Sequence, residues 1–280
     1  MPAYHFISGL PRSGSTLLAA LLRQNPDVFA GMTGPVGAVV HAARNAMGSA
    51  NEASVFMTDD HRARILRAIF DAYYADQQDK AVIFDTNRSW TARLPAIARL
   101  FPDAKVICCV RSVAWIMDSL ERLIRDQPFN ESRLFTSDSE RSNVYTRVDA
   151  LAQPDRFVGY AWSALKEAVY GESADRLLLI DFDLLTAAPQ KVLDLVYRFV
   201  GMDRYVHDTE AVAFDAPAFD AWIGLSGLHR VKPQVRPIRR RTILPPDLFQ
   251  RLDALSFWQD LKDSRAHIIT AQPAPSPAVV

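Results

Sequence analysis

A glycine-bounded loop near the N-terminus constrains the fold of this chain more than any other feature. Residues 6–18 read as a short apolar strand, then a tight turn bounded by Gly9 and Gly14, then the start of a helix. Glycine at both ends lets the backbone turn sharply and approach a phosphate closely. The N–H groups at the start of the helix then face the anion, assisted by the helix dipole. The sequence therefore predicts a phosphate-binding unit of the P-loop type.

The loop departs at one position from the loops of ATP-hydrolysing proteins. Where those proteins carry the lysine that reaches the β- and γ-phosphates, this chain has Ser15. The cation in the loop is Arg12, whose forked guanidinium suits a phosphate or a sulfonate. We therefore expect anion binding without metal-assisted ATP hydrolysis. The expected contacts come from Pro11, Arg12, Ser13, Gly14, Ser15 and Thr16.

Composition and charge exclude several classes of protein. Lys+Arg and Asp+Glu number 32 each, so a zero net charge argues against a nucleic-acid partner. No basic leader precedes the first apolar strand, and no apolar run approaches the roughly 20 residues of a membrane span. Adjacent Cys108 and Cys109 would point to opposite faces of a strand, which favours buried, reduced thiols and a cytoplasmic location.

Apolar runs alternate with helical patterns along the chain. Such alternation predicts a single α/β domain with a central parallel sheet and helices on both faces. The expected strands cover 4–7, 81–84, 105–110 and 176–180. The expected helices cover 15–24, 59–76, 90–100, 114–125, 157–170 and 189–200. We place the domain at residues 1–270, treat the irregular segment 126–155 as a lid, and expect 271–280 to be a disordered tail.

A second motif follows the strand at 105–110. Arg111 ends this strand, and Ser119 lies eight residues later in the next helix. In parallel sheets, ligands bind at the carboxyl ends of strands. Arg111 and Ser119 are therefore expected to lie on the same edge of the sheet as the first loop.

Together, the loop at 9–16 and the Arg111/Ser119 spacing resemble the soluble bacterial sulfotransferases, and the likeness extends over residues 4–245. The resemblance implies a P-loop NTPase-like sulfotransferase fold. It implies 3′-phosphoadenosine-5′-phosphosulfate (PAPS) as sulfonyl donor, adenosine 3′,5′-bisphosphate (PAP) as product, and no metal. By the same resemblance, Arg111 and Ser119 bind the 3′-phosphate.

A late basic segment adds to this likeness. Residues 230–242 hold six cations on a neutral protein, which forms a local anion patch. By resemblance this loop folds over the 3′-phosphate and adenine, with Arg230 and Lys232 as candidates; alone, the segment equally fits an RNA-binding or ligand-free surface. Trp162 and Tyr160 offer aromatic faces on which adenine could stack; the alternative is that they pack in the core.

The chain lacks the residues that serve as general base in the sulfotransferases it resembles. The glutamate of tyrosylprotein sulfotransferases has no counterpart near Thr33, and the histidine of cytosolic sulfotransferases is replaced by Asn87. Asp85, after the strand at 81–84, is our first candidate for the base, and His41 is the second. Arg88 is a candidate for stabilising the transferring sulfonate.

Two other functions remain compatible with the loop. One is a P-loop nucleotide kinase or NTPase, which should carry a lysine at position 15 and a metal-binding aspartate. The other is a nucleotide-binding protein without turnover. The acceptor, whether a small molecule, a glycan or a peptide, cannot be identified from these patterns, and the oligomeric state, a homodimer included, stays open.

Overall fold

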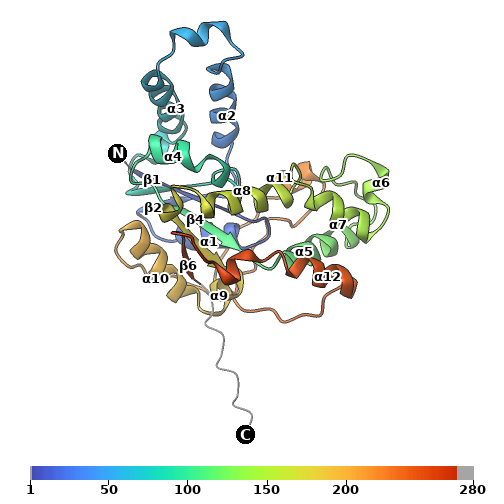
Figure 1. The fold of residues 1–280 in the computed structure, drawn as a ribbon. Coiled ribbons are helices and arrows are strands. Elements are labelled where there is room, and N and C mark those ends of the chain that lie inside the picture. The colour runs from blue at the N-terminus through green and yellow to red at the C-terminus, as the bar shows by residue number, and fades with distance from the viewer. Residues whose placement is uncertain (1, 270–280) are drawn as a thin grey trace.

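The computed structural model describes residues 2–269 and contains a six-stranded parallel sheet (Figure 1). The strand order is β2-β3-β1-β4-β5-β6, and β1 lies between β3 and β4. The strands are β1 (Ala3–Gly9), β2 (Val28–Ala30), β3 (Val82–Thr86), β4 (Val106–Val110), β5 (Leu177–Asp181) and β6 (His267–Ile269). The carboxyl ends of β1, β3 and β4 thus meet at one edge, where the predicted motifs begin.

Each face of the sheet carries its own hydrophobic core. The smaller core buries α1 (Ser15–Leu22), α9 (Phe182–Ala187) and α10 (Pro189–Val200). The larger core receives α2 (Val36–Ala46), α3 (Asp59–Tyr73), α4 (Leu94–Leu100), α5 (Val113–Arg125), α7 (Val144–Ala152), α8 (Gly159–Tyr170), α11 (Pro217–Ile223) and α12 (Pro246–Asp253). The expected α/β fold with helices on both faces is confirmed.

The adjacent cysteines illustrate how the strands divide the two cores. Cys108 faces the larger core and Cys109 the smaller one, as alternation along a strand requires. Both are free and buried, and burial raises the pKa of Cys109 to about 12. The expectation of buried, unpaired strand thiols is confirmed.

Several elements were not predicted. The segment 126–155 is not irregular throughout, because it contains α6 (Asp138–Arg141) and α7. Helix α7 is held to α5 by Glu121, whose buried carboxylate accepts hydrogen bonds from Arg147 at 2.6 and 2.9 Å.

No helix within 2–269 is long and apolar enough to cross a membrane. The tail predicted at 271–280 lies outside the described residues.

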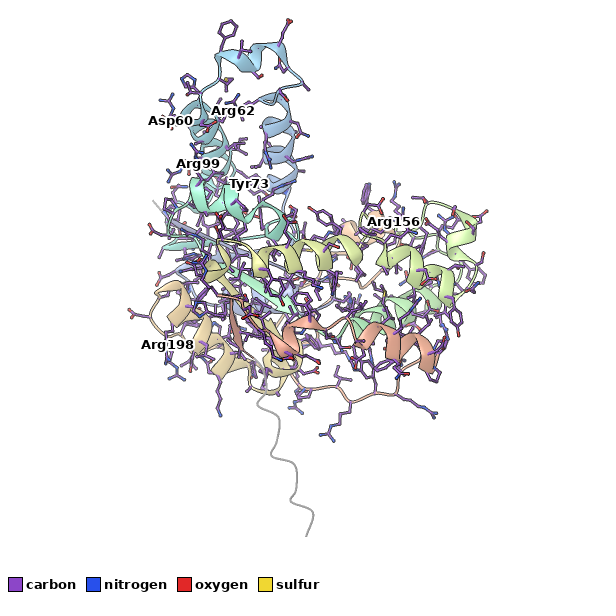
Figure 2. The ribbon with its side chains drawn as sticks, in the orientation of Figure 1. Asp60, Arg62, Tyr73, Arg99, Arg156 and Arg198 are labelled. Atoms are coloured by element: carbon purple, nitrogen blue, oxygen red, sulfur yellow. The ribbon has the colours of Figure 1, made fainter. Side chains whose placement is uncertain are left out.

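The helices α2 and α3 form an arm that projects from the body (Figure 1). Arg62 of α3 braces the arm by donating to the backbone carbonyls of Met47 and Ser54, at 3.2 and 3.0 Å (Figure 2). The tip carries the exposed side chains of Val55 and Phe56. Residues 31–35 connect β2 to α2, and Thr33 of this connection lines the cavity described below.

His5 lies in the amino-terminal half of β1, away from the carboxyl ends of the strands. It is 4% exposed, and its Nδ1 accepts a hydrogen bond from the backbone N–H of Lys105 at 3.0 Å. Burial, with the nearby Lys105 charge, lowers the pKa of His5 from 6.5 to about 4. The folded protein therefore holds this imidazole neutral under conditions in which an unfolded chain would protonate it.

We predict that His5 makes the free energy of unfolding pH-dependent. Because its folded pKa is lowered, its contribution is complete above pH 6.5 and is lost as pH falls towards 4, by about 3 kcal/mol. His5→Asn, which keeps an acceptor for Lys105 but does not titrate, should lack this part of the loss in urea unfolding measured across that range. Exposed His61→Asn is the matched control, and identical pH profiles for wild type and His5→Asn would contradict the prediction.

Candidate active site

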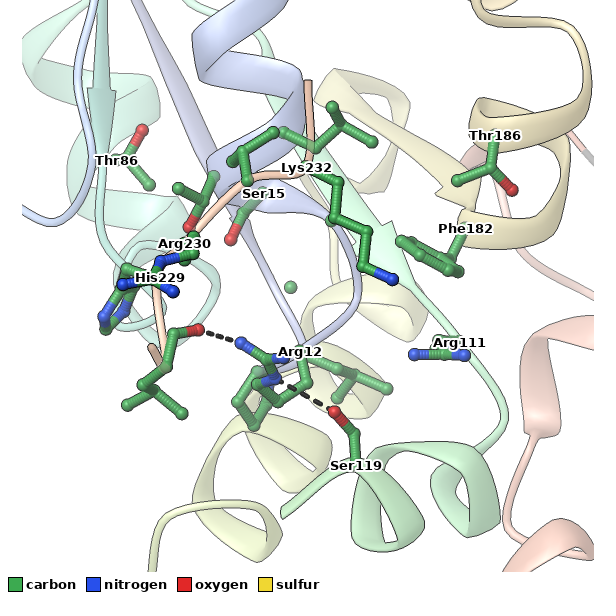
Figure 3. A pocket seen from close by; sticks show the side chains of 18 of the residues that line it. Arg12, Ser15, Thr86, Arg111, Ser119, Phe182, Thr186, His229, Arg230 and Lys232 are labelled. Atoms are coloured by element: carbon green, nitrogen blue, oxygen red, sulfur yellow. Dashed lines mark hydrogen bonds between the residues drawn. The ribbon is translucent and has the colours of Figure 1, made fainter. Parts of the chain in front are cut away.

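A cavity of about 350 Å³ opens at the carboxyl ends of β1, β3 and β4 (Figure 3). Its floor is the turn between β1 and α1, and its wall includes Thr86 at the end of β3 and Arg111 after β4. The segment after α11, residues 228–240, closes the remaining side. The cavity therefore brings the first loop, the Arg111/Ser119 motif and the basic segment together.

The loop is held against β4 by contacts that require glycine at position 9. Gly9 has a φ of 103°, and a Cβ there would lie 2.2 Å from the carbonyl oxygen of Cys109. That same oxygen accepts hydrogen bonds from the Leu10 N–H at 2.9 Å and from the Ser13 hydroxyl at 2.8 Å. Side chains other than hydrogen do not fit here, so the glycine expected from the sequence has a steric cause.

The start of α1 is prepared for an anion. Gly14, with a φ of 99°, occupies the N-cap position and provides no side chain to cap the first N–H groups. The first turn contains no acidic residue, and Ser15 and Thr16 line the cavity. Uncapped N–H groups and the positive end of the helix dipole both favour a phosphate at this point.

Arg12 adopts a left-handed backbone conformation, with a φ of 58°, which is uncommon for a residue other than glycine. Its Nε donates to the Ser119 hydroxyl at 3.2 Å, and its Nη1 donates to the carbonyl of Leu228 (Figure 3). Burial and the neighbouring Arg111 lower the pKa of Arg12 to about 10. The guanidinium of Arg12 thus connects the loop by hydrogen bonds to Ser119 of α5 and to the segment after α11.

Arg111 lies close to Arg12 and forms no ion pair with the side chains of residues 2–269. Its guanidinium carbon lies 4.2 Å above the ring of Phe182, a cation–π contact, and its buried Nε has no hydrogen-bond partner among the described residues. Burial, followed by the charge of Arg240, lowers the pKa of Arg111. A buried donor without a partner is costly unless a ligand completes it.

The lining of the cavity is rich in positive charge, although Arg230, Arg236 and Arg240 each pair with a carboxylate outside it, Asp215, Glu210 and Asp118. Seven cationic residues line it, and no aspartate or glutamate does so within residues 2–269. The cations are Arg12, Arg88, Arg111, Arg230, Lys232, Arg236 and Arg240. On a chain of zero net charge, this concentration defines a site for a polyanion.

A buried carboxylate on α5 holds the basic segment in place. Asp118, fully buried, accepts hydrogen bonds from the Ile243 N–H at 2.8 Å and the Thr242 hydroxyl at 3.0 Å. Arg240 forms an ion pair with it at 2.8 Å. Burial alone would raise the pKa of Asp118, but these contacts outweigh it and keep the pKa below its usual value. Asp118 thereby fixes the segment beside Ser119.

The structure places the first candidate for the base, Asp85, away from the cavity. Asp85 is 1% exposed and does not line it. Its carboxylate accepts hydrogen bonds from the Tyr74 hydroxyl at 2.6 Å and from the Trp90 indole at 2.7 Å. Burial raises its pKa. The carboxylate ties β3 to the residue that ends α3 and to the segment before α4.

We predict that Asp85→Asn lowers the stability of the protein and leaves ligand binding in the cavity intact. The amide accepts less well than the carboxylate from Tyr74 and Trp90, so the expected loss is about 1–3 kcal/mol in the free energy of unfolding. Nucleotide affinity should be unchanged in calorimetry. Asp76→Asn, on the exposed surface, is the control, and an Asp85→Asn protein of native stability without transfer would restore Asp85 as the base.

The other predicted residues divide between the cavity and its surroundings. Arg88 lines the cavity, with its guanidinium carbon 4.2 Å above the ring of Phe157. His41 is exposed on α2, where its Nε2 contacts Asn45 at 3.2 Å, and it does not line the cavity. Trp162 is also outside, because its indole donates to the carbonyl of Leu255 at 2.8 Å.

Sequence reasoning missed three kinds of lining residue. Phe182 and Phe219 offer aromatic faces in place of Trp162. Arg240 was noticed only as part of a basic run. His229 lines the cavity and pairs with buried Asp220, a partnership between residues nine apart that no motif indicated. The only sequence signal was the presence of a histidine beside the expected nucleotide residues.

The geometry defines a class of protein: an α/β protein of the P-loop type whose cavity is lined by cations and whose loop has Ser15 in place of the lysine of ATPases. A family model described as the sulfotransferase family matches residues 5–207. The chain therefore belongs to the sulfotransferase family. Residues 228–240, which close the cavity, lie beyond the matched range.

A solved structure shares this fold at low sequence identity. The sulfotransferase domain from the curacin biosynthetic pathway is 16% identical, with a TM-score of 0.57 over 91% of this chain and 97% of that one. A sulfotransferase from Alicyclobacillus acidocaldarius is 17% identical, with a TM-score of 0.48 over 79% of this chain and 89% of that one. A search of curated protein sequences gives no match.

Proposed function

We propose that the protein transfers a sulfonyl group from PAPS to a hydroxyl or amine of an acceptor and releases PAP, without a metal. The observation that carries this proposal is a cavity that, among residues 2–269, is lined by seven cations and no carboxylate and is built around a loop with Ser15 at the lysine position. PAPS presents a phosphosulfate and a separate 3′-phosphate, which need two anion sites. The family match supports sulfonyl transfer, because such enzymes use this donor.

The residues divide between the two ends of the donor. The N–H groups of the 11–16 loop and Arg12 would bind the 5′-phosphosulfate. Arg111 and Ser119 would bind the 3′-phosphate, with Arg230 and Lys232 closing over it. In transfer, the acceptor oxygen or nitrogen bonds to sulfur while the bond from sulfur to the bridging phosphate oxygen breaks. Arg12 would neutralise the charge that develops on that oxygen, and Arg88 would stabilise the moving sulfonate.

The acceptor side of the cavity is partly apolar. Phe157, Phe219 and Ile223 line it, near Arg88 and His229. Apolar walls with a few polar groups are typical of small-molecule sites. We therefore favour a small acceptor with an apolar body over a glycan.

A nucleotide kinase on the same scaffold fits the site less well. A kinase needs a lysine for the β- and γ-phosphates and an aspartate at the end of a strand for Mg²⁺. Here Ser15 occupies the first position, and β4 leads into Arg111. Cations replace the metal ligand at the strand end, which favours a second phosphate at this place.

We predict that PAP binds much more tightly than AMP in calorimetry, with equal affinity in EDTA and in Mg²⁺. Arg111→Ala should weaken PAP binding by about 2–3 kcal/mol, through loss of charge-assisted hydrogen bonds to the 3′-phosphate. AMP, which lacks that phosphate, should bind both proteins alike. Arg198→Ala, on the exposed side of α10, is the control (Figure 2). Equal losses for PAP and AMP, or a requirement for Mg²⁺, would contradict the proposal.

A further inference from the structure

A histidine and a buried aspartate form a pair in the wall of the cavity. Asp220 of α11 is fully buried, and its Oδ1 lies 2.6 Å from Nδ1 of His229. Its other oxygen accepts the backbone N–H of His229 at 3.0 Å. The histidine side chain is 18% exposed and lines the cavity. Two contacts to one carboxylate therefore fix both the backbone and the ring of His229.

This pairing determines which ring nitrogen is free. The Asp220 carboxylate accepts a hydrogen bond, so Nδ1 carries the proton of the neutral imidazole and Nε2 carries the lone pair. Nε2 has no hydrogen-bond partner within residues 2–269. The ring of Phe219 packs edge-on against the imidazole at 5.2 Å, which restricts its rotation. The site thus contains an oriented imidazole with an unoccupied acceptor atom.

The position of the imidazole follows from Arg12. The carbonyl of Leu228 accepts a hydrogen bond from Arg12, and His229 is the next residue (Figure 3). Arg12 belongs to the loop that would bind the phosphosulfate, so His229 borders the place where sulfur is transferred. Neither Asp85 nor His41 has such a place, because neither lines the cavity.

We propose that His229 is the general base of the transfer and that Asp220 is its positioning residue, an inference that rests on the proposed function. His229 Nε2 removes the proton from the acceptor hydroxyl as the acceptor oxygen bonds to sulfur and the bridging oxygen leaves with PAP. The imidazolium formed is stabilised by the Asp220 carboxylate and then releases its proton to solvent. The step requires no other reactant.

The test compares two acceptors that differ in their need for a base. 4-Nitrophenol is largely ionised in mildly alkaline buffer, whereas 2-phenylethanol keeps its proton, and both are small and aromatic. Transfer from labelled PAPS is measured in wild type, His229→Ala, His229→Asn and Asp220→Asn, with PAP affinity measured by calorimetry. His229→Asn keeps an amide donor for Asp220, which separates loss of the base from loss of the fold. Exposed His61→Ala is the matched control.

The expected loss with 2-phenylethanol is on the order of 10²–10⁴ in kcat for both His229 variants, because general-base catalysis contributes about that much. 4-Nitrophenol transfer and PAP affinity should change little, and added imidazole should restore His229→Ala. Asp220→Asn should lower kcat with 2-phenylethanol selectively, without raising the KM for PAPS. Equal losses with both acceptors, or no loss with either, would overturn the assignment.

The same variants distinguish failure of the base from failure of the function. If the wild type uses neither acceptor, release of PAP from PAPS with water as acceptor is followed in its place, with the same expectations for the variants. A wild type that binds PAP but turns over neither acceptor nor water overturns the base assignment. A wild type that does not bind PAP overturns the proposed function itself.

Discussion

The carbonyl oxygen of Cys109 is the contact on which the site depends. It accepts hydrogen bonds from the Leu10 N–H and the Ser13 hydroxyl, and it lies so close to Gly9 that no side chain fits there. These contacts hold the turn after β1 against β4. Because Arg111 lies two residues after Cys109, directly after β4, the same contacts fix the distance between the two predicted phosphate sites.

Two buried carboxylates hold the other half of the cavity. Asp118 binds residues 240–243 to α5, and Asp220 binds His229 to α11. Neither carboxylate lines the cavity, although Asp118 pairs with Arg240, which does. A loop tied at both ends presents its arginines and lysine with less entropy to lose on binding, which favours a preformed nucleotide site.

The sequence predicted those parts of the structure that depend on local chemistry. The 9–16 loop, the strand before Arg111 and the helix at 189–200 each carry their own signal, through glycine spacing, apolar runs and amphipathic periodicity. Strand β6 does not, because three residues at the edge of the sheet are ordered only by pairing with β5. Helix α7 was missed for a similar reason, since its packing uses the ion pair between Arg147 and Glu121.

The site residues also divide into those that a local motif predicts and those that only the folded structure brings together. Arg12, Arg111, Ser119, Arg230 and Lys232 were expected on one edge from their motifs, and the structure brings them to one cavity. Asp85 was assigned from its place after a strand, which determines the edge but not the face. Its side chain points into the larger core, beside Trp90, because Phe6 and Asp85 are paired in register on that side. The partnership between His229 and Asp220 forms only when α11 and the following turn fold together.

A crystal structure with PAP tests the central claim most directly. The account predicts the 5′-phosphate within the turn at residues 11–16, against the start of α1, and the 3′-phosphate between Arg111 and Ser119. It also predicts that His229 Nε2 faces the space beyond the 5′-phosphate, where an acceptor would lie. Density for PAP outside this cavity, or with the 3′-phosphate in the 11–16 turn, would contradict the account.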